Sequence, residues 1–452
     1  MRERRSVAVV APLVAMIQTL TGRRGQWRQL VGILSVAVLA FLLAGSSAAP
    51  RRAQPVAAPA QATATETRGV AGAPLAAPDL ALRLESLLGE HAVLAADMMR
   101  SRIRGDEDFV QTANAALGEN TDAMTDLIAS NFGTAAATRF KSLWVAHVTA
   151  LFTYSSGLAT HSEAVRAGAQ TTLVNFERDL AGFFADASQG RLNRDVAQPL
   201  VLMHVDHLLH QADAYAGRDY PTADLLYRQG YEHTYDLGKV IAAALVPPDQ
   251  APALDAPVWR LRSELARLLG EHVVLIIDAT RAGVRNGPDF RAAADGMNGN
   301  TSDLAGAVAG LFGQPAAAEF QSLWADHVDQ IMAYTAAVVS RNPQGRDAAV
   351  AKLGVFENRF ASFLDTATER RLDSATLAKA LLMHDQMLLH QTDAFATKQY
   401  RQAHEMAHST YTGMFDMAGQ FADAFSATVA APVPSGGPKT GMGGMAGVVG
   451  NR

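Results

Sequence analysis

Histidine is the residue type whose number and spacing point most clearly to chemistry in this sequence. Of the 13 histidines, eight form four pairs at equivalent positions of two similar segments. The histidine pairs are His91 with His272, His147 with His327, His204 with His384, and His210 with His390. The acidic pairs are Glu90 with Glu271, Glu177 with Glu357, and Asp213 with Asp393. Imidazole and carboxylate ligands without thiolates suit iron, zinc, copper or manganese, so the sequence predicts a transition-metal site in each segment.

Helix geometry limits which of these residues can share one ion. A site inside a helical bundle takes one or two ligands from each of several helices. His204 and His210 are six residues apart, about 120° around a helix, so only one of them should join His91 and His147. Asp213 shares a face with His210 and could bind the ion or orient that ring through an N–H group. The predicted metal ligands are His91, His147, His204, His210 and Asp213 in the first segment and His272, His327, His384, His390 and Asp393 in the second, with Glu177 as a further oxygen donor.

The same histidines have a structural interpretation. A histidine on an apolar helix face often forms a buried hydrogen bond to a carboxylate or a backbone carbonyl. The protein would then be a non-catalytic cell-envelope module that presents helical surfaces to a protein partner. A metal site requires the histidines of one segment to converge, and the structural alternative does not. Asn120 and Asn300 are expected to be helix caps or loop residues, and Trp144 and Trp324 to anchor the core.

One short motif raises a third possibility, a zinc-dependent peptidase. The pattern H-E-x-x-H occurs with its histidines at His404 and His408 and its glutamate at Glu405, and in known enzymes it binds zinc from a helix. The first segment has Asp224 and Arg228 at the histidine positions, and no Glu or His follows His408. A zinc-dependent peptidase is therefore less favoured than a metal-binding protein or a structural module. Nucleophile-elbow, P-loop and dinucleotide-binding motifs are absent, so we assign no catalytic residue and favour binding or sensing over catalysis.

The two segments are copies of one repeat. Residues 120–220 align with residues 300–400 without a gap, and 35 of these 101 positions are identical. "FGTAAATRFKSLWVAHV" in the first copy corresponds to "FGQPAAAEFQSLWADHV" in the second. Self-similarity over such a length indicates that one structural unit has been duplicated.

Each repeat is expected to be entirely helical. Apolar residues such as Leu84, Leu87, Leu88, Leu94 and Met98 recur at steps of three and four, the period of a helix packed on one side. No segment alternates polar and apolar residues in the way of a half-buried strand. The fold class is all-α, with two tandem up-and-down bundles of about six helices each and disordered ends. The expected order is a helical repeat at 78–246, a Pro-rich joint at 247–256, a second helical repeat at 257–430 and a disordered tail at 431–452.

The N-terminal region has the pattern of an export signal. Arg23, Arg24 and Arg28 precede an apolar run at 30–44, and small residues follow it. This is typical of a secretion signal cleaved after Ala48, although the run and its small residues could also remain as a membrane anchor. We predict a signal peptide or N-terminal membrane anchor at 1–49, an Ala/Pro-rich linker at 50–77 and an extracytoplasmic location, secreted or membrane-associated.

Composition excludes several classes of protein. The chain has no cysteine, which rules out disulfides, thiolate metal sites, iron–sulfur clusters and a cysteine nucleophile. The net charge is −5 and the folded repeats contain no basic run, so nucleic acid is not an expected partner. Hydrophobic residues make up 49% of the chain, enough for a packed core in each repeat.

Each repeat resembles one found in uncharacterised exported bacterial proteins. The resemblance rests on three patterns in order along the chain: G-E-H, then L-W-x-x-H-V, then L-M-H followed by H-Q-x-D-A. The resemblance covers both copies, at about 82–245 and 261–425. Some of those proteins are labelled copper amine oxidase-like, but this chain lacks the Asn-Tyr-Asp/Glu sequence that forms the quinone of that enzyme. The layout is also similar, by analogy, to hemerythrin- and ferritin-like bundles. It differs from those bundles in two ways. It lacks the H-x-x-x-E motif in the corresponding helices, and it also lacks paired E-x-x-H motifs.

Overall fold

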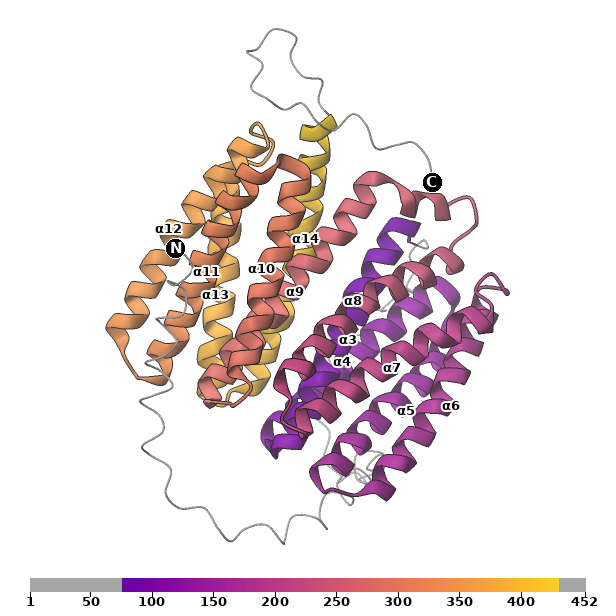
Figure 1. Cartoon of the computed structure of the whole chain (residues 1–452). Coiled ribbons are helices and arrows are strands. Elements are labelled where there is room, and N and C mark those ends of the chain that lie inside the picture. Colours follow the sequence, from indigo (N-terminus) through magenta and orange to yellow (C-terminus); the bar gives the residue numbers. More distant parts are fainter. Residues whose placement is uncertain (1–74, 431–452) are drawn as a thin grey trace, which may run out of the picture. The chain divides into compact units, whose positions relative to one another are not determined.

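The computed structural model describes residues 75–430, which form twelve α-helices, one short 3₁₀ helix and no strand. The six helices of the first bundle are α3 (Ala77–Arg104), α4 (Glu107–Phe132), α5 (Thr134–Ala159), α6 (Glu163–Ala187), α7 (Arg194–Ala216) and α8 (Tyr220–Leu245). Those of the second are α9 (Pro257–Arg285), α10 (Phe290–Phe312), α11 (Gln314–Val339), α12 (Pro343–Ala367), α13 (Ser374–Ala396) and α14 (Tyr400–Ala430). The prediction of an all-α fold with two bundles of about six helices is confirmed (Figure 1). The predicted signal or anchor, most of the linker and the tail lie outside the described residues.

Short local signals separate the helices. Gly133 and Gly313, at equivalent positions, have φ values of 86° and 85°, a region that favours glycine because it lacks a Cβ atom. Asn193 begins α7 by accepting a hydrogen bond from the backbone N of Val196 (2.9 Å). Between the bundles, the 3₁₀ helix η1 (Ala251–Asp255) connects α8 to α9. These glycines and caps end and begin the helices at equivalent positions, so the two bundles have helices of similar length in the same order.

The first helix of each bundle is its most enclosed element. Helix α3 packs against α4, α5, α7 and α8, and α9 packs against α10, α11, α13 and α14. From residue 84 to residue 101, α3 has only two positions that are not buried. Because a helix surrounded on all sides keeps its polar side chains out of water, the polar residues of α3 and α9 need partners inside the bundle.

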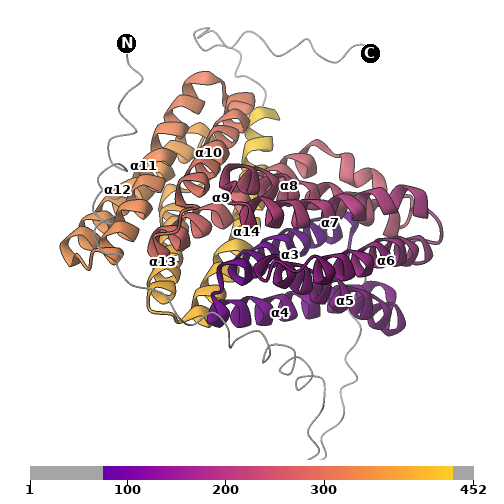
Figure 2. The same ribbon diagram turned by 60° about the horizontal axis from the view of Figure 1, so that its bottom comes forward.

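The two bundles contact each other in a reciprocal manner. Arg100 of α3 lies 3.2 Å from Asp278 of α9, and Arg281 of α9 lies 2.8 Å from Asp97 of α3. Arg281 and Asp278 are the counterparts of Arg100 and Asp97 in the repeat. Such an exchange of equivalent contacts is the property of a two-fold interface. In the views of Figures 1 and 2, α3–α8 and α9–α14 form two adjacent groups of helices.

None of the helices within residues 75–430 combines the length and the apolar character needed to cross a bilayer.

Candidate metal centre

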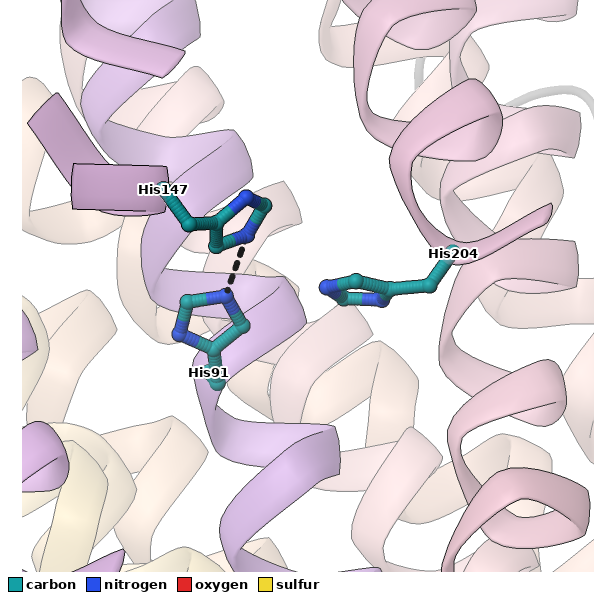
Figure 3. A group of neighbouring side chains, drawn as sticks. All are labelled: His91, His147 and His204. Atoms are coloured by element: carbon teal, nitrogen blue, oxygen red, sulfur yellow. Dashed lines mark hydrogen bonds between the residues drawn. The ribbon is translucent and has the colours of Figure 1, made fainter. Parts of the chain in front are cut away.

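Three histidines from three helices of the first bundle converge on one point. They are His91 of α3, His147 of α5 and His204 of α7, and one ring nitrogen of each lies within 4.8 Å of the others. The Nε2 atoms of His91 and His147 are 3.3 Å apart. Figure 3 shows these two rings facing each other, with His204 reaching toward them from the opposite helix. The three side chains are 0–2% exposed, so the group lies inside the bundle.

The second bundle repeats this arrangement. His272 of α9, His327 of α11 and His384 of α13 also place one ring nitrogen each within 4.8 Å of the others. The ring centroids of His272 and His327 are 5.4 Å apart, the same distance as for His91 and His147. Duplication has therefore preserved the relative placement of the side chains together with their identity. Each group could hold a metal ion.

Aromatic rings enclose both triads. In the first, the Trp144 ring lies 4.7 Å from His91, and Phe176 stacks on His147 at 4.2 Å between centroids. In the second, Trp324 lies 4.7 Å from His272, and Phe356 stacks on His327 at 4.5 Å. These apolar walls exclude water and fix the orientation of the imidazoles.

Burial keeps the triads uncharged. It lowers the pKa of His91 to about 3 and the pKa of His384 to about 4. Burial also lowers the pKa of the other four histidines well below the ordinary value, with a smaller contribution from neighbouring triad histidines. All six are therefore neutral at pH 7. The neutral imidazole, with a free lone pair on one nitrogen, is the form that binds a metal.

Several ring nitrogens of the triads have no hydrogen-bonding partner among the described residues. The atoms are Nδ1 of His91 and His147, Nε2 of His204, and both nitrogens of His272, His327 and His384. A buried polar atom left unpaired costs about 1–3 kcal/mol, and a structural polar network would supply its partners. A bound ion would take up one nitrogen of each ring, Nε2 of His204 being one such atom, and no hydrogen-bond network among the described residues does this.

The other predicted ligands lie away from the triads. His210 and His390 are exposed on α7 and α13, because six residues turn them away from His204 and His384. Asp213 accepts hydrogen bonds from the Tyr154 hydroxyl at 2.8 and 3.0 Å. Its counterpart Asp393 accepts one from the Tyr334 hydroxyl at 2.8 Å and also pairs with Arg346. None of these four predicted ligands, His210, Asp213, His390 and Asp393, belongs to the groups that converge.

The matched glutamates of α6 and α12 are also outside these groups. Glu177 and Glu357 are buried, and burial raises the pKa of Glu177 to about 7, with a smaller contribution from Asp206. A residue that the sequence did not single out lies closer: Oδ1 of Asp385 is 3.3 Å from Nδ1 of His327. Asp385 was missed because its counterpart is Val205, and only matched residues had been considered.

Asn120 and Asn300 hold the helices that carry the first histidine of each triad. The prediction that they are caps or loop residues was wrong, because both are buried inside α4 and α10. Asn120 donates to Glu90 Oε2 (3.0 Å) and to the Leu87 carbonyl oxygen (3.1 Å). Asn300 makes the same pair of bonds to Glu271 (2.9 Å) and Leu268 (3.0 Å). Because each glutamate directly precedes a triad histidine, these bonds fix the rotation of α3 and α9 about their axes.

The H-E-x-x-H residues do not assemble a third group among the described residues. His404 is buried and stacks on Phe109 at 5.0 Å between centroids. Nδ1 of His408 instead contacts the Glu90 carboxylate, and Glu405 pairs with Arg401. The motif therefore serves contacts between α14 and the first bundle in this structure.

Comparison with known proteins gives no family for this chain. It matches no protein-family model, no curated protein and no solved structure. The duplicated histidine triad is consequently the feature from which a function has to be argued.

Proposed function

We propose that this protein is an exported metal-binding protein that holds one transition-metal ion in each bundle. The observation that carries the proposal is the convergence, twice in one chain, of three neutral histidines from three helices. Convergence in a single bundle could arise from packing alone. Its repetition in a second bundle, where most aligned positions differ, favours a shared ligand.

The spacing of the nitrogens supports this proposal. Two nitrogens bound 2.0–2.1 Å from a tetrahedral ion are about 3.3 Å apart, and the Nε2 atoms of His91 and His147 are separated by 3.3 Å. The other nitrogens lie within 4.8 Å of one another and would have to approach further to bind one ion. Zinc, copper and iron all accept imidazole ligands.

The surroundings favour binding or sensing over catalysis. Three histidines leave one position of a tetrahedral ion open, as in catalytic metal sites, but catalysis also requires that water or substrate reach that position. In both triads the histidines are at most 4% exposed, and Trp144 and Phe176, or Trp324 and Phe356, close the space around the rings. A substrate would have to displace these aromatic side chains to reach the ion.

The extracytoplasmic location rests on the sequence. The three arginines before the apolar run at 30–44, and the small residues beyond it, are the pattern of an export signal. A chain without cysteine that binds its metal through histidine retains its ligands in an oxidising compartment.

The test is the metal content of the full chain purified without a polyhistidine tag. We expect about two equivalents of one transition metal per chain, measured by inductively coupled plasma mass spectrometry after incubation with Zn²⁺, Cu⁺ or Fe²⁺. The variant His204→Asn/His384→Asn should lose both. Its matched control is His210→Asn/His390→Asn, which changes exposed histidines of the same two helices and should keep both.

Two outcomes would contradict the proposal. One is a folded wild-type chain, helical by circular dichroism, that takes up none of these ions. The other is equal metal content in the triad variant and its control. Either would favour the alternative of a cell-envelope module whose histidines are structural.

A further inference from the structure

The two triads differ by one buried carboxylate. Asp385 follows His384 on α13, and its Oδ1 lies 3.3 Å from Nδ1 of His327. The two side chains are 2% and 1% exposed, so water does not separate or screen them. The contact lacks the alignment of a hydrogen bond and the imidazole is neutral, so it is a close approach of a carboxyl to an uncharged ring. Asp385 does not belong to the convergent group of ligand atoms, which consists of His272, His327 and His384.

The first bundle has an apolar side chain in this place. Val205, the counterpart of Asp385, is 1% exposed, and Nδ1 of His147 has no partner among the described residues. The matched carboxyl Glu177 neighbours Asp206, and neither residue has an ion pair with a triad histidine in the described part of the chain. In the second bundle Glu357 adds a second carboxyl beside Asp385, and burial, with a smaller contribution from Glu357, raises the pKa of Asp385 well above its ordinary value.

A carboxylate in this position changes the ligand and its ion in two ways. A carboxylate that accepts the Nδ1 proton of a histidine fixes the tautomer, leaves the Nε2 lone pair for the ion and increases the basicity of the ring. Beside a bound dication, which favours its ionised form, the carboxyl also compensates part of the charge of the ion; an uncompensated dication in an apolar interior is strongly disfavoured. Three neutral imidazoles in an apolar pocket compensate none of that charge.

We propose that the two sites are selective for different ions. The second site binds a divalent transition-metal ion supported by Asp385. The first site, which has only imidazoles, compensates none of the charge of a divalent ion and binds it more weakly, so its preference shifts toward a monovalent ion such as Cu⁺. This inference rests on the metal sites proposed above. The surroundings of the two sites differ in charge, and the sites therefore differ in affinity for divalent ions.

The experiment measures each site alone in the full chain. His204→Asn leaves the second site, and His384→Asn leaves the first. Zn²⁺ affinity is measured by competition with a chromophoric chelator, and Cu⁺ affinity by anaerobic competition. We expect Zn²⁺ to bind the second site at least ten times more tightly than the first. We expect the ratio of Cu⁺ to Zn²⁺ affinity to be higher at the first site.

Exchange of the differing residue provides the matched controls. In the chain with only the second site, Asp385→Val should lower Zn²⁺ affinity about 10- to 100-fold, the usual effect of losing such a partner. Asp385→Asn keeps the shape of the side chain and removes its charge, and it should also lower Zn²⁺ affinity. It replaces Asp385→Val as the test if that variant folds poorly. In the chain with only the first site, Val205→Asp should raise Zn²⁺ affinity.

The outcomes separate this inference from the proposed function. Equal Zn²⁺ affinities at the two sites, unchanged by Asp385→Val or Asp385→Asn in folded chains, would overturn the inference while leaving two metal sites. Absence of binding at both sites, for Zn²⁺ and for Cu⁺, would overturn the proposed function and the inference with it.

Discussion

The Nε2 atoms of His91 and His147 lie 3.3 Å apart although the two residues are 56 positions apart in the chain. Two neutral imidazoles at this distance can share one proton, or they can both donate lone pairs to one ion. His204 brings a third nitrogen to the same point and has no protein partner for it in the described structure. The ion accounts for all three nitrogens, whereas the shared proton accounts for two.

Tryptophan fluorescence should report the occupation of each site separately. The rings of Trp144 and Trp324 each lie 4.7 Å from a triad histidine, His91 and His272 respectively. A paramagnetic ion such as Cu²⁺ at that distance quenches indole emission. In the chain carrying Trp324→Phe and His384→Asn, we expect excess Cu²⁺ to quench the share of the emission that comes from Trp144, while Trp27 and Trp259 continue to emit. Adding His204→Asn should abolish the quenching, and unchanged quenching in that chain would place the ion elsewhere.

A buried carboxyl at Glu85 should make stability fall as the pH rises. Burial raises the pKa of Glu85 from 4.5 to about 8, against a smaller opposite effect of the hydrogen bond from Ser263. The folded state therefore holds a proton that the unfolded state releases above pH 4.5, so stability is lost between pH 4.5 and pH 8. Glu85→Gln should raise the free energy of unfolding at pH 7 by about 3 kcal/mol, at about 1.4 kcal/mol for each pKa unit.

Urea denaturation of both chains at pH 5 and pH 7 measures this difference. At pH 5 the wild-type chain and Glu85→Gln should have nearly the same stability, because Glu85 is then protonated in the folded state. A variant that is less stable than the wild type at pH 7 would contradict the assignment of Glu85 as a neutral acid.

Arg100 should be among the side chains most important for stability. Its guanidinium contacts Asp224 at 2.9 Å and Asp278 at 3.2 Å, with all three side chains largely buried. Arg100→Met would leave two buried carboxylates without a counter-ion, which costs about 3–5 kcal/mol. The control is Arg139→Met, which removes an exposed pair with Asp186 and should cost less than about 1 kcal/mol. If both variants lose the same free energy of unfolding in urea denaturation, burial does not determine how much these ion pairs contribute to stability.

The hydrogen bonds of Asp213 and Asp393 should affect stability and leave metal content unchanged. Tyr154 and Tyr334 donate to these carboxylates at 2.8 Å, and the carboxylates are partly exposed, so each bond should contribute about 1 kcal/mol. We expect Tyr154→Phe and Tyr334→Phe to lower the thermal midpoint by a few degrees. Both variants should retain two equivalents of metal. Loss of an equivalent from either would restore Asp213 or Asp393 to the metal site.

The sequence by itself determined the all-helical fold, the duplication and the histidines worth considering. Apolar periodicity is a local property, and a gapless alignment of two copies needs no coordinates. His147 and His204 match their counterparts in that alignment, and His91 matches His272 through the sequence LLGEH upstream, with a one-residue shift. The sequence could also show that His204 and His210 point in different directions, because helix geometry fixes the angle between them.

Only the tertiary structure decided which face of α7 is turned toward α3 and α5, and therefore that His204, and not His210, joins the triad. It also placed Asn120 inside a helix, where it holds Glu90, although its polarity and a following Thr had indicated a cap or loop. Asp385 became visible as a partner of His327 because the two belong to different helices, α13 and α11. Contacts between helices depend on how each helix is rotated about its axis and packed against its neighbours. The order of residues along the chain does not directly specify that rotation.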